Sequence, residues 1–268
     1  MPRPLSVGAL RAWEWPGDEP GALLLHGIGN YGRYWDFFAD AVAGRLRLVA
    51  PDARGHGESA KPAEGYAAED FVADAVAVMD ASRLARPVLV GHSMGGVHAT
   101  ALALAHPSRV RALVLVDSGP GVEHAGGSRA RRLSLERPDH FPDEAAALAY
   151  LKETSPGYSD AVYENRLAFA FRRFADGALE WRSSKDALRK IFDEDSRAVW
   201  DRLREVSCPV LVVRGTRSPS LSAETVTEML TTLRDARSLE LDAGHNVALD
   251  RPRELADAVV ALAKGVSA

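Results

Sequence analysis

Residues 88–96 of this 268-residue chain read VLVGHSMGG, and they give the clearest indication of its fold. Three apolar residues that favour β-strands come first, followed by the pattern Gly-x-Ser-x-Gly and then by a small, apolar segment that ends before Pro107. The order predicts a strand, a very tight turn at Ser93 and a helix. Glycine is needed two positions before and after the serine because side chains there would collide. Such a turn exposes the serine hydroxyl above the sheet, beside free N–H groups that favour developing negative charge.

Short apolar segments elsewhere in the chain predict further buried strands. They run without alternation, which is typical of a parallel sheet covered on both faces. Residues 5–15 alternate more and predict an opening antiparallel hairpin, while helical spacing of apolar residues predicts a helix through 71–79 and a last helix from about Pro252. This alternation predicts an α/β fold with a doubly wound, mostly parallel sheet. The predicted buried strands, besides 88–90, are 22–25, 46–50, 110–116, 210–213 and 238–241.

One long segment, residues 121–208, interrupts the alternation. It contains no convincing strand, and it is too long to be a loop. We therefore expect a helical cap, inserted after the strand that ends at Asp117, over the carboxyl edge of the sheet. Residues 1–120 and 209–268 then form the core, to which the last cap helix returns. The helical patterns in the cap run through 143–153, 160–174, 184–192 and 196–206.

The composition restricts the class of protein. Hydrophobic residues make up 46% and charged residues 26%, as in ordinary globular proteins. The net charge of −4 gives no basic surface for nucleic acid or an anionic membrane. Cys208 is the only cysteine, so no internal disulfide is possible. No apolar run is long enough for a membrane span, and the first residues do not read as a secretory signal. We expect a cytoplasmic protein.

Together with three other segments, the Ser93 turn resembles the α/β-hydrolase superfamily, in particular its capped, esterase-like members with a nucleophilic serine. The resemblance covers nearly the whole chain and implies the α/β-hydrolase fold. It is a poor guide to the substrate, because one fold hosts many chemistries. The three segments are 25–29 (LHGIG), 52–59 (DARGHGES) and 243–245 (AGH).

The resemblance also implies two backbone donors for an oxyanion. A carbonyl under attack becomes a tetrahedral oxyanion, and losing one preplaced N–H donor typically costs about 10²–10³ in rate. In such enzymes the donors correspond here to the N–H groups of Ile28 and Met94. His26 and His56, by contrast, are expected to hold loops rather than to transfer protons.

His245 is the expected general base. A serine hydroxyl is a poor nucleophile at neutral pH and needs an imidazole within hydrogen-bond reach. Of the eight histidines, only His245 lies in a glycine-preceded loop after the last predicted strand. This is where the fold places its base, and the order of serine before histidine matches the superfamily.

The acid that should orient His245 departs from the commonest pattern. Many relatives carry it just after the strand that corresponds to 210–213, but residues 214–222 contain no Asp or Glu, and Pro219 stands at the expected position. Some members carry the acid at the end of the neighbouring strand, which here is Asp117. We therefore predict Asp117, with Asp242 as the alternative.

The cap suggests an apolar substrate. Aromatic residues are frequent in it, and pockets of this kind are mostly apolar. We expect an apolar acyl or aryl group, contacted by His92, Phe169 and Trp181. Six arginines of the cap are expected to form a solvated face, although one could bind a carboxylate: Arg129, Arg131, Arg132, Arg166, Arg172 and Arg173.

These features predict a serine hydrolase that cleaves a small-molecule carboxylic ester or lactone through an acyl-enzyme, without a metal or organic cofactor. The serine at the turn argues against epoxide hydrolases and haloalkane dehalogenases, which resemble this chain but use aspartate there. Two alternatives remain. One is a carbon–carbon bond hydrolase of the ring-cleavage type, and the other is a non-catalytic ligand-binding protein with the same fold.

Overall fold

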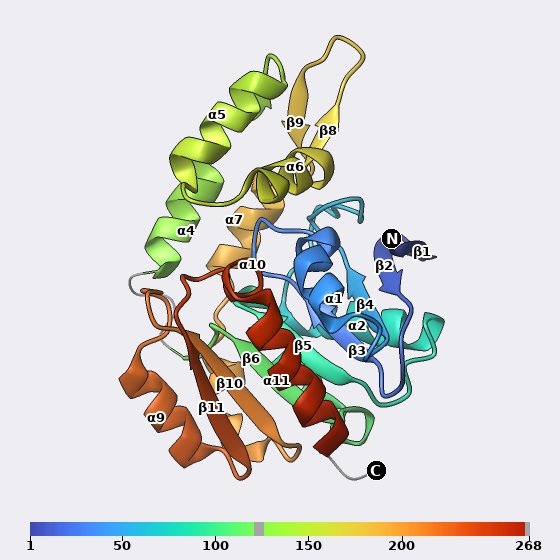
Figure 1. Cartoon of the computed structure of the whole chain (residues 1–268), viewed down its shortest axis with the longest axis vertical. Coiled ribbons are helices and arrows are strands. Elements are labelled where there is room, and N and C mark those ends of the chain that lie inside the picture. The colour runs from blue at the N-terminus through green and yellow to red at the C-terminus, as the bar shows by residue number, and fades with distance from the viewer. Residues whose placement is uncertain (121–125, 266–268) are drawn as a thin grey trace.

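A single eight-stranded sheet organises the chain. The computed structural model describes residues 1–120 and 126–265, so positions 121–125 of the expected cap and 266–268 of the expected core lie outside the described residues. The strand order is β1-β2-β4-β3-β5-β6-β10-β11 (Figure 1). The strands are β1 Arg3–Val7, β2 Leu10–Trp15, β3 Ala22–Leu25, β4 Leu48–Pro51, β5 Val88–His92, β6 Ala112–Val116, β10 Val210–Gly215 and β11 Ala236–Leu241.

The pairing confirms the predicted sheet. β1 pairs antiparallel with β2, and β2 with β4, whereas every other neighbouring pair is parallel. All residues of β3, β4, β5 and β6 are buried. Such uninterrupted burial explains why these segments are apolar throughout and do not alternate.

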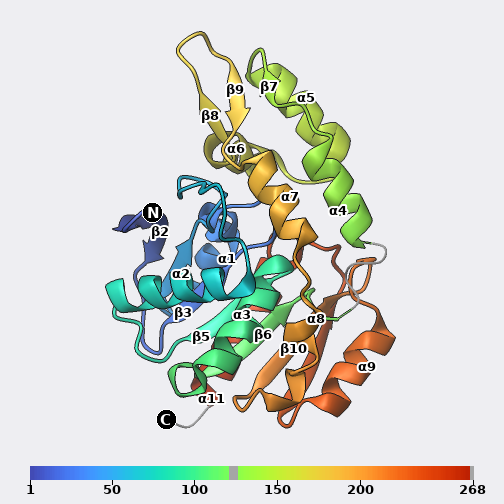
Figure 2. The same cartoon turned by 180° about the vertical axis from the view of Figure 1, so that it is seen from behind.

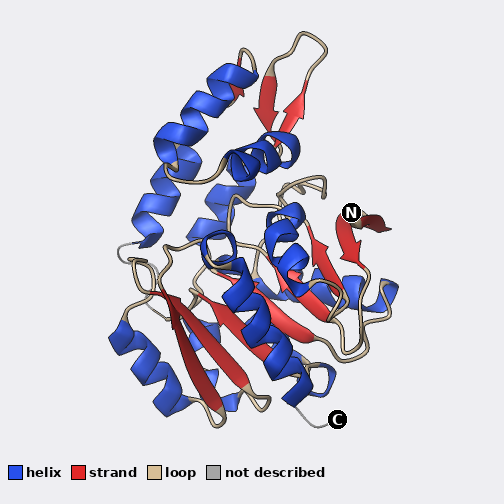
Figure 3. Ribbon diagram, in the orientation of Figure 1, coloured by secondary structure: helices blue, strands red, loops and turns tan. Residues whose placement is uncertain are grey.

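Helices cover both faces of the sheet, as Figure 3 shows. Because successive side chains in a strand point to opposite faces, Leu24 packs in one core cluster and Leu23 in the other. The first face is covered by α1 Asp36–Val42 and α11 Pro252–Gly265 (Figure 1). The second is covered by α2 Ala68–Ala81, α3 Met94–Ala105 and α9 Ala223–Thr232 (Figure 2). No helix within the described ranges combines the length and apolar character needed to cross a bilayer.

The inserted segment lies over the carboxyl ends of the parallel strands (Figure 1). Its last part returns to the core, where Trp200 and Leu203 pack in the cluster on the α3 face. The helices are α4 Gly126–Leu135, α5 Glu144–Thr154, α6 Asp160–Phe169, α7 Lys185–Asp193 and α8 Arg197–Trp200, followed by the 3₁₀ turn η3 Leu203–Glu205.

The cap also contains a small sheet that the sequence did not predict. β7 His140–Phe141, β9 Leu179–Trp181 and β8 Phe171–Arg173 pair antiparallel in that order. The helix expected over 160–174 therefore ends at Phe169. Strands of two or three residues are too short to display a period, which is why helical spacing was the only pattern visible there.

Candidate active site

The turn at Ser93 has the strained geometry that its glycines suggest. Ser93 joins β5 to α3 with φ = 52° and ψ = −120°, in a region that side chains seldom adopt. A Cβ at Gly91 would overlap the backbone of Gly95, and a Cβ at Gly95 would overlap the carbonyl of Leu25. The Ser93 N–H donates to the Val116 carbonyl at 3.1 Å, which ties the turn to β6.

Asp117 and His245 meet beside this turn. The Nδ1 atom of His245 lies 2.7 Å from Oδ2 of Asp117, which is fully buried immediately after β6. Asp117 has φ = 48°, and its N–H donates to the Val213 carbonyl of β10 at 2.8 Å. An Nδ1–H that donates to a carboxylate leaves Nε2 as the acceptor nitrogen of the ring.

Two groups at the end of β10 and just after it also donate to the Asp117 carboxylate. The Gly215 N–H donates to Oδ1 at 3.1 Å, and the Ser218 hydroxyl donates to Oδ2 at 2.5 Å. Ser218 is itself buried, and its oxygen accepts from the Ser220 N–H at 3.1 Å. Donors of this kind fix the direction of the carboxylate. Ser218 was missed by the sequence analysis, which recorded only the missing acid in its segment.

Ser93 and His245 line the same space. Both contribute to two adjoining cavities, of about 170 Å³ and about 400 Å³. No hydrogen bond joins the Ser93 hydroxyl to the His245 ring among the described residues. Contacts of this type are commonly long before substrate binds and tighten in the complex.

The two expected oxyanion donors flank the serine. Ile28 follows β3, and Met94 is the first residue of α3; both line the smaller cavity. A Cβ at Gly27 would lie 3.2 Å from the Cβ of Ser93, so the loop that carries Ile28 runs directly against the Ser93 turn. Within the described parts of the chain, neither N–H has an acceptor among the hydrogen bonds of the structure.

His26 and His56 hold loops, as expected. His26 Nδ1 donates to the Gly27 carbonyl at 2.8 Å, and its Nε2 accepts from the Ala53 N–H at 3.0 Å. His56 accepts from the Gly29 N–H at 3.0 Å and donates to the Arg54 carbonyl at 3.0 Å. Burial lowers the pKa of His26 to about 4 and the pKa of His56 well below its usual value, so both rings stay neutral.

Asp242, the alternative acid, does not contact His245. Its carboxylate pairs with Arg217 at 2.8 Å and with Arg251 at 3.2 Å, and its side chain is 68% exposed. The structure therefore brings only one of the two candidate acids to the imidazole.

His92 has a contact that the sequence did not reveal. Its Nε2 lies 2.9 Å from the carbonyl oxygen of His245, and its ring stacks on Tyr34 with centroids 5.3 Å apart. Burial lowers its pKa well below the usual value. Although His92 lines the larger cavity, its hydrogen bond fixes the backbone of the His245 loop.

Phe169 and Trp181 are not where the sequence analysis placed them. Neither lines either cavity that contains Ser93. The Arg33 guanidinium lies 4.0 Å from the Phe169 ring centroid, and Trp181 packs on Phe171 with centroids 4.1 Å apart. Phe169 packs the cap against the core, and Trp181 packs within the cap. The sequence alone does not show whether an aromatic residue lines a pocket or packs in this way. Besides Ile28, the smaller cavity is lined by the bulky apolar residues Met94, Val97, Ile191, Phe192 and Trp200.

Metal-binding residues do not cluster in the described residues. No group of three or more His, Cys, Asp or Glu side chains there has the arrangement needed to hold an ion.

Comparisons with known proteins agree with this architecture. The family model for the alpha/beta hydrolase fold matches residues 23–252. The 3-hydroxybutyrate-oligomer hydrolase of Cupriavidus necator is 31% identical over 92% of this chain and 90% of that protein. Esterase Rv0045c of Mycobacterium tuberculosis is 27% identical over 95% of this chain and 86% of its own.

A solved structure extends the comparison. The crystal structure of E-2-(acetamidomethylene)succinate hydrolase has a TM-score of 0.84 and 26% identity, and the match covers 98% of this chain and 99% of that one. Taken with the sequence relatives, it supports a hydrolase. The relatives act on different compounds, so they leave the bond and the substrate to be argued from the site.

Proposed function

The chain belongs to the alpha/beta hydrolase fold family, and on this basis we propose that it is a serine hydrolase that cleaves a carboxylic ester or lactone through an acyl-enzyme. One observation carries the proposal: the buried Asp117 carboxylate is bonded to Nδ1 of His245, whose ring shares a cavity with the strained Ser93. In this arrangement Ser93 can act as the nucleophile, His245 as the base that takes its proton, and Asp117 as the acid that orients His245.

In the first half of the reaction, the Ser93 hydroxyl attacks the substrate carbonyl while Nε2 of His245 takes its proton. Asp117 keeps the ring in the required tautomer and stabilises the imidazolium, without itself taking a proton. The carbonyl oxygen becomes an oxyanion between the N–H groups of Ile28 and Met94.

In the second half, the tetrahedral species collapses and the carbon–oxygen ester bond breaks. His245 gives its proton to the departing alcohol, which leaves the acyl group on Ser93. A water molecule then attacks the acyl carbon while His245 takes its proton. As the bond between the acyl carbon and Ser93 Oγ breaks, His245 returns this proton to Ser93 Oγ and the acid is released. In a lactone, the alcohol stays tethered to the acyl group.

The lining of the smaller cavity supports an apolar acyl or aryl group in the substrate. Val97, Ile191 and Phe192 bring aliphatic and aromatic surface close to Ser93. Removing such a group from water favours binding by roughly 25 cal/mol per Å² of buried apolar surface.

A substrate panel tests the proposal. We expect p-nitrophenyl esters of short acids to be hydrolysed with an initial burst of p-nitrophenol, since the acyl-enzyme accumulates, and Ser93→Ala to abolish both burst and turnover. Lactones and a vinylogous diketo acid complete the panel. Turnover that persists in Ser93→Ala contradicts the proposal, as does turnover of the diketo acid with none of any ester or lactone. Tight ligand binding without turnover would instead favour the non-catalytic protein.

A further inference from the structure

The two cavities at Ser93 differ in charge. The smaller is lined by Glu194 and Asp195 and by no lysine or arginine among the described residues. In the larger, the described lining includes no Asp or Glu but three arginines, which are Arg129, Arg166 and Arg217. The electrostatic potential of the larger cavity is therefore the more favourable for an anion.

The three arginines are not equivalent. Arg217 is 62% exposed and pairs with Asp242 at 2.8 Å, and Arg129 is exposed. Arg166 is half-buried, and within the described residues its guanidinium has no ion pair and no hydrogen-bond acceptor. Other cap arginines are neutralised by carboxylates, such as Arg172 by Glu180. Because Arg166 lines the larger cavity, an anion that enters this cavity can displace water from the guanidinium without competing with a carboxylate of the described chain.

The neighbour of Arg166 in the sequence anchors it. Asn165 accepts from the Tyr31 hydroxyl at 2.8 Å and donates to Asp36 at 2.9 Å and to the Arg33 carbonyl at 3.2 Å. These bonds fix α6 of the cap on the core at this point. The backbone that carries Arg166 is therefore held in place before any ligand binds, which reduces the conformational entropy that Arg166 loses when it binds one.

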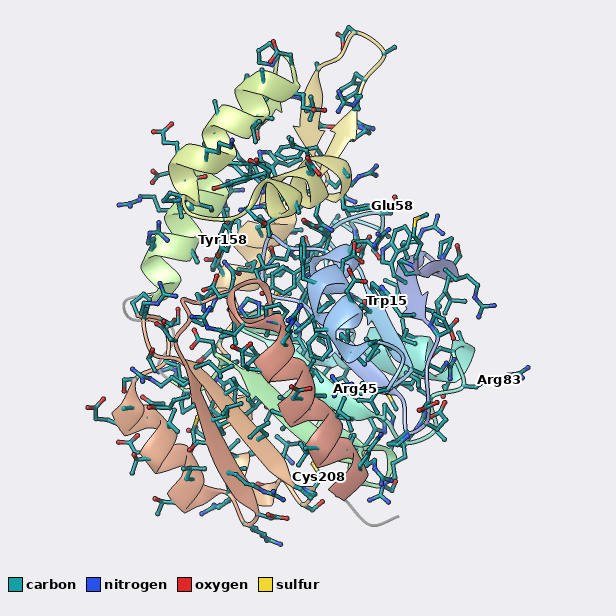
Figure 4. All side chains as sticks on the ribbon, in the orientation of Figure 1. Trp15, Arg45, Glu58, Arg83, Tyr158 and Cys208 are labelled. Carbon is teal, nitrogen blue, oxygen red and sulfur yellow. The ribbon has the colours of Figure 1, made fainter. Side chains whose placement is uncertain are left out.

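The polar groups around Arg166 reach to the histidine loop. Tyr158, which lies between cap and core (Figure 4), accepts from Asn246, the residue after His245, at 3.0 Å. Burial raises the pKa of the Tyr31 and Tyr158 hydroxyls, and the nearby charge of Arg166 opposes the rise in both. The positive charge of Arg166 is therefore felt in the cavity that Ser93 and His245 also line.

We propose that the substrate carries a carboxylate, which binds Arg166 in the larger cavity while the apolar arm of the same substrate occupies the smaller one. This inference rests on the proposed ester or lactone hydrolysis and names its substrate class. A planar guanidinium matches a carboxylate with two parallel hydrogen bonds. With the scissile carbonyl between the cavities, the two arms fix the ester across Ser93.

Two isosteric substrate pairs test this inference. For a carboxylate on the acyl arm, the pair is p-nitrophenyl hydrogen pimelate and its terminal carboxamide; for one on the alcohol arm, it is 4-butyryloxybenzoate and 4-butyryloxybenzamide. In at least one pair, we expect kcat/KM for the carboxylate to exceed that for the amide by about 10- to 100-fold. The ratio should fall to about one in Arg166→Gln and recover in part in Arg166→Lys.

Arg189→Gln is the matched control, because Arg189 is an exposed cap arginine that pairs with Asp186 at 2.8 Å and lines neither cavity. It should leave the ratios unchanged. A carboxylate preference near one in both pairs, or one that Arg166→Gln preserves, overturns the inference while ester hydrolysis by Ser93 still stands.

A binding measurement separates the two proposals. Calorimetric titration of the wild-type protein with 4-phenylbutyrate and with 4-phenylbutyramide requires no catalysis. We expect the carboxylate to bind more tightly, and Arg166→Gln or high salt to remove the difference. Equal affinities overturn the carboxylate site. A preference that depends on Arg166, in a protein without esterase activity, would support the carboxylate site and contradict only the proposed reaction.

Discussion

Histidines lie in two loop regions at the same edge of the sheet, one after β3 and β4 and the other after β11, and their hydrogen-bond partners differ. In the loops after β3 and β4, both ring nitrogens of His26 and of His56 are bonded to backbone groups. In the loop after β11, His245 gives one nitrogen to a carboxylate and turns its ring to a cavity. The partners of a histidine therefore decide its role. A ring whose two nitrogens are both bonded to backbone holds a loop, whereas a ring with a free acceptor nitrogen can take up a proton.

The largest effect should come from the partner of His245. Asp117→Asn keeps the shape of the side chain but allows the wrong tautomer of the ring, and we expect turnover to fall by about 10⁴. Steady-state kinetics on the best ester of the panel would measure the loss, with circular dichroism to establish that the variant is folded.

Asp242→Asn is the matched control, because Asp242 lies in the same loop region as His245 but pairs with Arg217 and Arg251. It should change turnover by less than about threefold. Loss of activity in Asp242→Asn, with Asp117→Asn active, would reverse the assignment of the acid.

A smaller effect is expected at Ser218, a positioning residue that acts through Asp117. Ser218→Ala removes one of the donors that fix the carboxylate, and we expect kcat to fall by about 3- to 10-fold with KM unchanged. Ser218→Thr retains a hydroxyl and should recover most of the activity. If Ser218→Ala changed KM alone, or if Ser218→Thr were no better than Ser218→Ala, the hydroxyl would not act through Asp117.

The scaffold histidines should affect stability more than chemistry. His56→Ala leaves the Gly29 N–H and the Arg54 carbonyl without their partner, and we expect the free energy of unfolding to fall by about 2–3 kcal/mol. Urea unfolding would measure this, while kcat of the folded variant should stay within about fivefold of the wild type. A collapse of kcat in a stable His56→Ala protein would move this residue from scaffold to mechanism.

The same histidines predict a loss of stability in acid. In the unfolded chain a histidine titrates near pH 6.5, whereas burial lowers the pKa of His26 to about 4 in the folded protein. Between these values this residue binds more protons in the unfolded chain, so its contribution to the free energy of unfolding falls as the pH falls from about 6.5 to about 4. Above about pH 7, both states are neutral and the contribution of these histidines is constant.

Urea unfolding at pH 7, 6 and 5 measures the slope. His56→Gln should make it shallower by up to ~1.4 kcal/mol per pH unit, because one buried, neutral ring is removed. His140→Gln, at an exposed position in the cap, is the control and should leave the slope as it is. Equal slopes in the wild type and His56→Gln would mean that His56 is not held neutral by the fold.

The core could be predicted from sequence because its signals are local and repeated. Buried parallel strands are apolar without interruption, and the Ser93 turn needs its glycines within a few positions. Asp117 was predicted by another route, from the family resemblance, because residues 214–222 contain no acid and some members carry it at the end of the neighbouring strand. Its contact with His245 follows from the order of the strands in the sheet.

The rest depended on contacts that leave no local pattern. Ser218 is one serine in a serine-rich segment, and only the fold brings its hydroxyl to Asp117. Phe169 and Trp181 are aromatic, as pocket residues often are, but Phe169 packs against Trp13 of the core and Trp181 packs against Phe171 within the cap. Arg166 was grouped with solvated arginines because the sequence does not reveal that it lacks a carboxylate partner within the described chain.

The rate at which a fluorophosphonate adds to the protein reports how nucleophilic Ser93 is, and it therefore measures whether Asp117 and His245 activate this serine. We predict a single covalent adduct, located at Ser93 by peptide mass spectrometry, that does not form in Ser93→Ala and forms more slowly in Asp117→Asn by about 10³-fold or more. An adduct at another residue, or an equal rate in Asp117→Asn, would contradict the account.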